Sequence, residues 1–235
     1  MATLEAGGKL VTLYGAVSSS EPCPVVFLNT VMDEGKQVYA ACRKLGAPPF
    51  VLAAVSRVNW SDDMTPWPTE ALAKWESRCG GMADLYLGKL ESDIVPAVCD
   101  ALPFTPSGLY LAGYSLGGLF ALYALWKTTL FTRVASASGS LWYPDFAEYC
   151  LTEAPAGVPE RVYLSLGSKE TKSRGRTACL LGNTTAVGDR LRDLGAEVVF
   201  EENPGGHTHE ADRRMAKAIL AEIIEEALNG KEIAG

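Results

Sequence analysis

One serine of this 235-residue chain has neighbours that favour nucleophilic catalysis. Ser115 stands in the run Gly113-Tyr114-Ser115-Leu116-Gly117, directly after an apolar stretch and directly before a segment with helical character. A serine at a sharp turn from strand to helix has a strained backbone, and small residues two positions away on either side avoid clashes. The sequence therefore predicts Ser115 as the nucleophile of an acyl-transfer reaction.

The chain has only two histidines that could activate this serine by removing its proton. His207 and His209 follow Gly205 and Gly206, between the last predicted strand and the last predicted helix. His207 lies closer to the strand end, whereas His209 approaches the helix, so we predict His207 as the general base. The alternatives are an ordinary surface loop or a metal site, but no carboxylate or cysteine at ligand spacing accompanies the pair. We expect neither a metal ion nor a cofactor.

A third residue should orient the imidazole. In one class of serine hydrolases the chain order is nucleophile, acid, base, and the acid follows a late strand. Glu170 fits this order, because it lies between Ser115 and His207 and shortly after the predicted strand at 161–166. The alternatives are that Glu170 is a solvated loop carboxylate, or that Asp189, on a predicted helix, takes the role.

Two backbone N–H groups should bind the negative charge that develops on the carbonyl oxygen. The first is that of Leu116, at the beginning of the helix, where the helix dipole also favours negative charge. The second should come from the residues after the strand at 24–29, that is Asn29, Thr30 or Val31. We predict Thr30, although a backbone donor has no side-chain signature.

Four large side chains are predicted to line a substrate pocket. Arg57 and Trp60 follow one strand, and Trp142 and Tyr143 follow another, at the strand ends where open α/β folds bind ligands. The alternative for each is ordinary packing, since aromatic residues are commonly half-buried for apolar reasons alone.

The elements that must position these residues alternate between short apolar runs and segments with helical periodicity. This pattern predicts a mostly parallel sheet with helices on both faces and no large cap domain. The predicted strands are 9–14, 24–29, 50–56, 109–112, 133–137, 161–166 and 197–202. The predicted helices are 35–45, 71–102 with a kink at Pro96, 116–128, 184–194 and 210–229, and a loop is expected at 57–68.

The composition and the net charge limit the class of protein and its expected location. The chain is 48% hydrophobic and 21% charged, which is typical of a globular protein, and its length suits one domain over residues 1–235. The net charge of −7 and the scattered lysines and arginines argue against nucleic-acid binding. The apolar runs are too short to span a bilayer, and the first residues lack the pattern of a secretory signal, so we expect a cytoplasmic protein with six free cysteines.

Several motifs resemble those of the Putative esterase family of α/β-hydrolases, which includes enterochelin esterases, esterase D and feruloyl esterases. The resemblance implies an α/β-hydrolase fold and ester hydrolysis, with Glu170 and His207 in the triad. The sequence departs from the family pattern at Ser168, where an aspartate is expected. The motifs are Gly113-Tyr114-Ser115-Leu116-Gly117-Gly118, Ser138-Gly139-Ser140-Leu141-Trp142, Asp63-Met64-Thr65-Pro66 and Gly167-Ser168-Lys169-Glu170.

The predicted activity is hydrolysis of a small-molecule carboxylic ester through an acyl-enzyme on Ser115. One alternative is acyl transfer to an alcohol or sugar by the same triad. Another is a binding protein that kept the fold without catalysis, because fold alone does not guarantee activity. The sequence carries no signal of oligomeric state.

Overall fold

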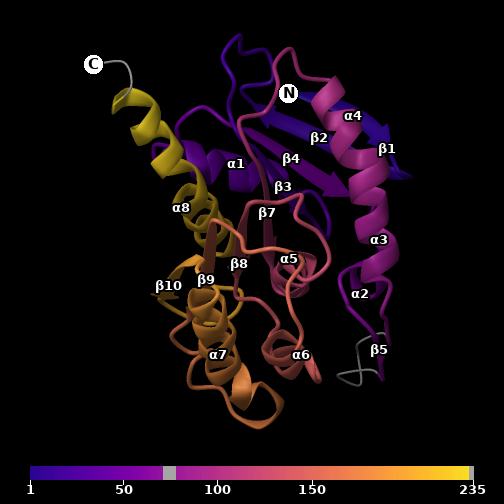
Figure 1. Cartoon of the computed structure of the whole chain (residues 1–235), viewed down its shortest axis with the longest axis vertical. Coiled ribbons are helices and arrows are strands. Elements are labelled where there is room, and N and C mark those ends of the chain that lie inside the picture. The colour runs from indigo at the N-terminus through magenta and orange to yellow at the C-terminus, as the bar shows by residue number, and fades with distance from the viewer. Residues whose placement is uncertain (71–77, 233–235) are drawn as a thin grey trace.

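The computed structural model describes residues 1–70 and 78–232, without side chains from 225 onward. Its centre is an eight-stranded sheet in the order β1-β2-β4-β3-β7-β8-β9-β10 (Figure 1). β1 and β2 are antiparallel to their neighbours, and all other neighbouring strands are parallel. The strands are β1 (Ala2–Ala6), β2 (Lys9–Gly15), β3 (Val25–Asn29), β4 (Val51–Ser56), β7 (Leu109–Tyr114), β8 (Arg133–Ala137), β9 (Arg161–Gly167) and β10 (Glu197–Asn203). A separate short pair joins β5 (Pro68–Thr69) to β6 (Cys79–Gly80).

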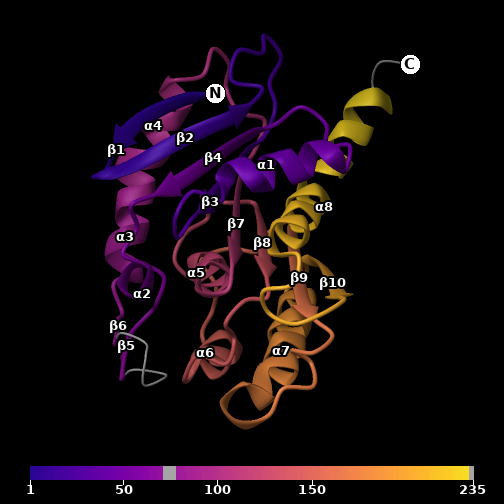
Figure 2. The same cartoon turned by 180° about the vertical axis from the view of Figure 1, so that it is seen from behind.

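Helices cover both faces of the sheet, as predicted. α1 and α8 pack on one face, which faces the viewer in Figure 2, and they share a core cluster with side chains from that side of the strands. α3, α4, α5, α6 and α7 contribute to a second cluster on the opposite face. The helices are α1 (Gly35–Lys44), α2 (Trp60–Asp63), α3 (Ala83–Lys89), α4 (Val95–Asp100), α5 (Leu116–Leu125), α6 (Phe146–Thr152), α7 (Leu180–Asp193) and α8 (Ala211–Glu232).

The central parallel strands are apolar because both of their faces are covered. β3 is buried at every residue, and β7 is buried over its four central residues. α5, which follows β7, is buried from Gly117 to its end, so it lies inside the molecule. The carboxyl ends of β3, β7, β8, β9 and β10 meet at one edge of the sheet, where the predicted site residues lie.

The hairpin of β1 and β2 was not predicted. Its two-residue turn consists of Gly7 (φ 56°) and Gly8 (φ 74°), a backbone conformation that glycine adopts without strain. β1 is mostly exposed, and its alternating pattern spans only five residues with Leu4 as the one large apolar side chain, so the pattern is too short to predict a strand.

The helix predicted at 71–102 differs from the observed structure. Its part at 71–77 lies outside the described residues, and β6 follows. Further on, α3 and α4 are joined through a π-helical turn at Leu90–Ile94, just before Pro96. Proline has no N–H and clashes with the carbonyl four residues earlier, so the wider π-helical turn accommodates Pro96, the residue at which a kink was predicted.

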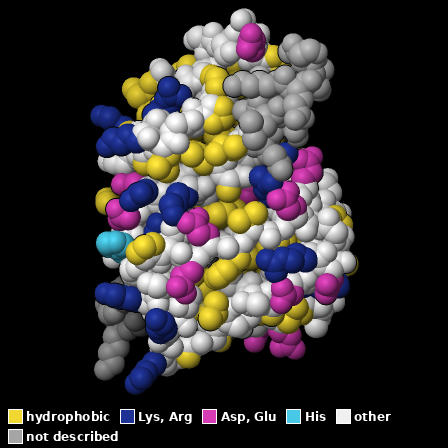
Figure 3. Space-filling view, turned by 90° about the vertical axis from the view of Figure 1, so that its left-hand side faces the viewer, with side chains coloured by type: hydrophobic (Ala, Val, Ile, Leu, Met, Phe, Trp, Pro, Cys, Tyr) yellow, Lys and Arg dark blue, Asp and Glu magenta, His cyan; other side chains and the backbone are white. Residues whose placement is uncertain are grey.

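Charges of both signs are mixed over the molecular face drawn in Figure 3, where lysine and arginine side chains alternate with acidic ones and with apolar patches. Among the described residues, no helix is both long and apolar enough to cross a membrane.

Candidate active site

Ser115 lies at the end of β7, in the turn that leads into α5. Its backbone has φ 58° and ψ −122°, a conformation that side chains other than glycine rarely adopt. Both predicted glycines lie where a Cβ would be crowded, and the crowding is far more severe at Gly113 than at Gly117. A Cβ at Gly113 would lie 2.0 Å from the Gly117 carbonyl oxygen, and a Cβ at Gly117 would lie 3.0 Å from the Trp60 indole. The local sequence therefore permits a tight turn that exposes the serine hydroxyl.

The structure brings Ser115, His207 and Glu170 into one hydrogen-bonded line. His207 Nε2 lies 3.0 Å from Ser115 Oγ, and His207 Nδ1 lies 2.7 Å from Glu170 Oε1. These distances are within the range for proton transfer and for orientation of the ring. The three side chains come from the turn after β7, the loop after β9 and the loop after β10.

The loops that carry Glu170 and His207 are joined to each other by backbone contacts. Lys169 N donates to Gly205 O at 3.0 Å, and Gly205 N donates to Ser168 Oγ at 3.2 Å. Ser168 N also donates to Asn203 O at 2.8 Å. Ser168, which departs from the family pattern, thus holds the histidine loop against the acid loop.

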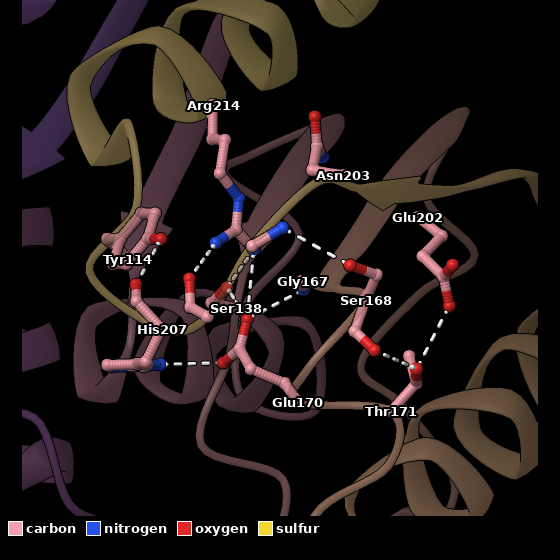
Figure 4. Close-up of polar contacts among 12 residues, drawn as sticks. Tyr114, Ser138, Gly167, Ser168, Glu170, Thr171, Glu202, Asn203, His207 and Arg214 are labelled. Carbon is pink, nitrogen blue, oxygen red and sulfur yellow. Dashed lines mark hydrogen bonds and ion pairs between the residues drawn. The ribbon is translucent and has the colours of Figure 1, made fainter.

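Glu170 is 6% exposed, and its Oε2 accepts several hydrogen bonds at once (Figure 4). The donors are Gly167 N at 2.6 Å, Ser138 Oγ at 2.7 Å and Arg214 Nη2 at 3.0 Å. Burial by itself would raise the pKa of Glu170, but the hydrogen bonds from His207, Ser138 and Gly167 outweigh it and lower the pKa to about 2. The carboxylate is therefore ionised at every pH at which the protein is expected to work.

Sequence reasoning missed Arg214 and gave Ser138 no role beyond its place in a family motif. Ser138 follows β8 with φ 45°, and Arg214 lies in the first turn of α8 with only 2% of its surface exposed. A signal for Arg214 does exist, because it directly precedes Met215 and Ala216 on the buried side of the helix. A charged residue in such a place needs a buried partner, although the sequence does not say which one.

The prediction for the second oxyanion donor needs correction. The Thr30 N–H already donates to Val55 O at 2.9 Å, and the Thr30 hydroxyl donates to the same oxygen at 3.0 Å. Thr30 therefore extends the pairing of β3 with β4 and has no N–H left for a ligand. Within the described residues, the N–H groups of Val31 and Leu116 donate to no protein atom. Val31, one of the three residues considered, is the better candidate.

A cavity of about 230 Å³ opens beside Ser115. Its walls are mainly apolar, and they include Leu28, Val38, Trp60, Tyr114 and Met215. Two carboxylates, of Glu34 and Asp212, also line it. Of the four predicted pocket residues, only Trp60 is part of this lining. Arg57 pairs instead with Glu5 of β1 at 2.7 Å, and Tyr143 is 1% exposed and donates to Trp67 O at 2.6 Å. Trp142 is half-buried against the core cluster that contains α5.

His209 and Asp189, the alternatives for the general base and for the acid, make contacts elsewhere. The His209 ring packs against Gly205, where a Cβ would come within 2.5 Å of it. Asp189 lies on α7 and accepts a hydrogen bond from Arg192 at 2.6 Å. Within the described residues, neither side chain makes a hydrogen bond with Ser115 or His207.

Comparisons with known proteins agree on one family and one fold. The sequence model of the family described as Putative esterase matches residues 18–221. The Bacillus subtilis protein YbbA, described as uncharacterized, is 28% identical over 180 residues, which are 72% of each chain.

Solved structures with the same fold include three hydrolases. The siderophore hydrolase EstB from Aspergillus nidulans has a TM-score of 0.70 and 18% identity, over 92% of this chain and 90% of its own. An IroE-like serine hydrolase from Shewanella oneidensis has a TM-score of 0.72 and 19% identity, over 92% and 76%. The enterobactin hydrolase IroE in complex with DFP has a TM-score of 0.69 and 21% identity, over 94% and 92%.

Proposed function

The chain belongs to the Putative esterase family, and on that premise we propose that it is a serine carboxylic-ester hydrolase with the triad Ser115, His207 and Glu170. The observation that carries the proposal is the line of two hydrogen bonds, 2.7 Å and 3.0 Å long, that connects Glu170 through His207 to the hydroxyl of Ser115. That hydroxyl lies on a strained turn that leads directly into Leu116, and Val31 lines the same cavity as Ser115. The N–H groups of Leu116 and Val31 are available to a ligand, as acyl transfer needs.

In the first half-reaction, Ser115 Oγ attacks the ester carbonyl while His207 Nε2 takes the hydroxyl proton. The N–H groups of Leu116 and Val31 donate to the carbonyl oxygen as it becomes negative. The tetrahedral intermediate then collapses, the bond to the alcohol oxygen breaks, and His207 returns the proton to the leaving alkoxide. Glu170 stays ionised throughout and stabilises the imidazolium.

In the second half-reaction, water replaces the alcohol. His207 Nε2 takes a proton from this water as its oxygen attacks the acyl-enzyme, and the bond to Ser115 Oγ then breaks. The proton passes from His207 to Oγ, which restores the free serine and releases the carboxylic acid.

The substrate that we propose is a small ester with an apolar group next to the scissile bond. The support is the mainly apolar cavity beside Ser115 and its modest volume of about 230 Å³. The names of the solved relatives describe hydrolases of siderophores and of enterobactin, so siderophore esters are the natural compounds to assay first. A cytoplasmic location stays a prediction, which imaging of the tagged chain in its own host would test.

Ser115→Ala tests the proposal directly. We expect the variant to hydrolyse short p-nitrophenyl esters at least ~10⁴-fold more slowly than the wild type, because the covalent step is lost. It should also fail to gain mass with DFP, while its circular dichroism stays unchanged. Ser140→Ala is the matched control, because it removes the hydroxyl that lies 3.4 Å from Ser115 Oγ and should leave labelling intact. Wild-type hydrolysis by Ser115→Ala, or labelling on another residue, would contradict the proposal.

A further inference from the structure

Arg214 is buried behind the Glu170 and His207 pair, where a single side chain reaches both catalytic loops. Its Nη2 donates to Glu170 Oε2 at 3.0 Å and also to Ser138 Oγ. Its Nη1 donates to the carbonyl oxygen of Gly206, directly before His207, at 3.1 Å. Figure 4 shows the guanidinium above the carboxylate, with Ser138 between them. Arg214 thus connects α8 to the acid, to the end of β8 and to the histidine loop.

These contacts fix which carboxylate oxygen is presented to the histidine. Oε2 receives Gly167 N, Ser138 Oγ and Arg214 Nη2, so Oε1 is left for His207 Nδ1. A glutamate has three rotatable side-chain bonds, and a carboxylate held at one oxygen only could turn away from the imidazole. The fork shape of the guanidinium suits this role, because one nitrogen binds the carboxylate while another binds the backbone.

The backbone of His207 is held from both sides. Arg214 binds Gly206 O, and the Tyr114 hydroxyl donates to His207 O at 2.7 Å. The guanidinium also lies over the Tyr114 ring, 5.6 Å from its centroid. Because Tyr114 directly precedes Ser115, one packed group links the position of the nucleophile to that of the base.

Arg214 also changes the charge that surrounds His207. The buried carboxylate of Glu170 is balanced by a permanent positive charge, so the triad does not depend on the imidazolium to neutralise it. The other titratable groups near this cluster are Tyr114, Asp212, Glu210, Glu201 and Lys217. Asp212 and Glu210 are exposed, and Glu201 is paired with Lys217. Loss of the guanidinium would leave the imidazolium as the main partner of a buried anion, and protonation of the base would become easier.

We infer that Arg214 is a positioning residue of the reaction, which orients Glu170 and the His207 loop and offsets the charge of the carboxylate. The inference rests on the proposed function. A merely structural ion pair, which only ties α8 to the sheet, would affect the fraction of folded enzyme. It would change neither the rate per active site nor its pH dependence.

Arg214→Met tests the inference, with active sites counted by DFP titration. We expect kcat per titrated site to fall by about 10- to 100-fold, because a catalytic group displaced by about 1 Å costs a rate of that order. KM should stay within about twofold, since Arg214 does not line the cavity beside Ser115. The acid limb of kcat/KM against pH should move upward by roughly one pH unit, because a positive charge near the base is lost.

Two further variants separate charge from shape. Arg214→Lys keeps the charge but cannot donate to Glu170 and Gly206 together. It should therefore keep the wild-type acid limb and lose only part of kcat, about 3- to 10-fold. Arg213→Met is the matched control on the same helix turn, because Arg213 is exposed and, among the described residues, pairs with Glu210 at 3.4 Å. Its kinetics should equal those of the wild type.

The outcomes distinguish the inference from the proposed function. If the wild type neither hydrolyses esters nor reacts with DFP, the proposed function fails and takes the inference with it. If the wild type is active and Arg214→Met keeps kcat per site and the acid limb, only the inference is overturned. Should Arg214→Met not fold, Arg214→Lys decides, and a kcat per site within twofold of the wild type would overturn the inference.

Discussion

The histidine loop sets two imidazoles in different surroundings although only one residue separates them. His207 points its Nε2 at Ser115 and its Nδ1 at Glu170, across 92 and 37 residues of sequence. The turn that continues after it, in which His209 N donates to Gly206 O at 3.1 Å, directs the His209 ring back over Gly205. Gly205 leaves room for this ring because glycine has no Cβ. Its φ of 90° is also a conformation that glycine adopts without strain.

This difference predicts unequal effects of the two histidine substitutions. His207→Ala should lower kcat on p-nitrophenyl butyrate about as far as loss of the nucleophile, because residues that act as a unit fail together. His209→Ala should keep kcat within about threefold of the wild type, since its ring lies against Gly205 and the hydrogen bonds of the proposed triad are made by His207. The measurement is kcat for both variants on the same ester, with thermal unfolding as a check on folding. A larger loss for His209→Ala would make the assignment of the base wrong.

The residues that the sequence indicated are those whose chemistry depends on local spacing. Ser115 has glycines on both sides, and His207 belongs to the one segment that contains histidine. Thr30 was wrongly predicted because an oxyanion donor is a backbone N–H, and only pairing with Val55 across the sheet shows that this N–H is occupied. Arg214 was missed because its partner Glu170 lies 44 residues away, and no local pattern records such a contact.

At the scale of elements, α8 serves the site at one end and the sheet along its length. Arg214 lies in its first turn, and two turns further on Glu222 is 1% exposed. Arg133 Nη1 donates to Glu222 O, and Arg161 Nη1 donates to Ala221 O, both at 2.6 Å, so the ends of β8 and β9 hold the middle of this helix. Burial raises the pKa of Glu222 to about 8, although Arg161 and Arg133 lower it.

The Glu222 pKa predicts how stability depends on pH. The folded state keeps a proton on Glu222 up to about pH 8, whereas the unfolded chain releases it near the ordinary value of 4.5. Wild-type stability should therefore decline as the pH rises from 4.5 to 8. Glu222→Gln removes this decline and should raise Tm by roughly 5 °C at pH 8.5, with little effect near pH 5.

Thermal unfolding at both pH values measures this effect. Glu160→Gln is the matched control, because Glu160 is an exposed partner of Arg133 at 3.1 Å and its removal should change Tm little at either pH. An equal shift in Tm for Glu222→Gln at both pH values would show that the carboxyl does not titrate in this window.

Helices and strands were predicted where a local sequence pattern determines them, and were missed where distant contacts or unusual backbone angles do. β3, β4, β7, β8 and β9 were predicted within two residues, because each is a largely buried run that both layers of helices cover. The edge strand β10 was predicted equally well, although it is partly exposed. α6 was not predicted, since its seven residues follow Asp145, whose positive φ of 63° starts the helix in a way that periodicity does not reveal. The order of the strands, with β4 between β2 and β3, also depends on contacts that the sequence does not record.

At the scale of the whole molecule, the sheet belongs to two hydrophobic cores at once. Along β3, Val25 and Phe27 face one cluster, and Val26 and Leu28 face the other. The alternation follows from strand geometry, in which successive side chains point to opposite faces. Neither layer of helices can separate from the sheet without exposing strands that the other layer also needs.

This shared sheet supports the prediction that the chain unfolds as one domain, and a substitution on one face tests it from the other. Ile219 on α8 is fully buried in the cluster that contains α1, whereas the described tryptophans belong to or pack against the other cluster. Ile219→Ala should lower the free energy of unfolding by about 2–5 kcal/mol through the cavity that it leaves.

In a single cooperative unit, the urea unfolding curves followed by tryptophan fluorescence and by circular dichroism would both shift to the same lower midpoint. Arg213→Ala, an exposed change on the same helix, should leave both midpoints in place. If the fluorescence midpoint stayed at the wild-type value while the circular dichroism curve split into two steps, the two faces would be separate folding units.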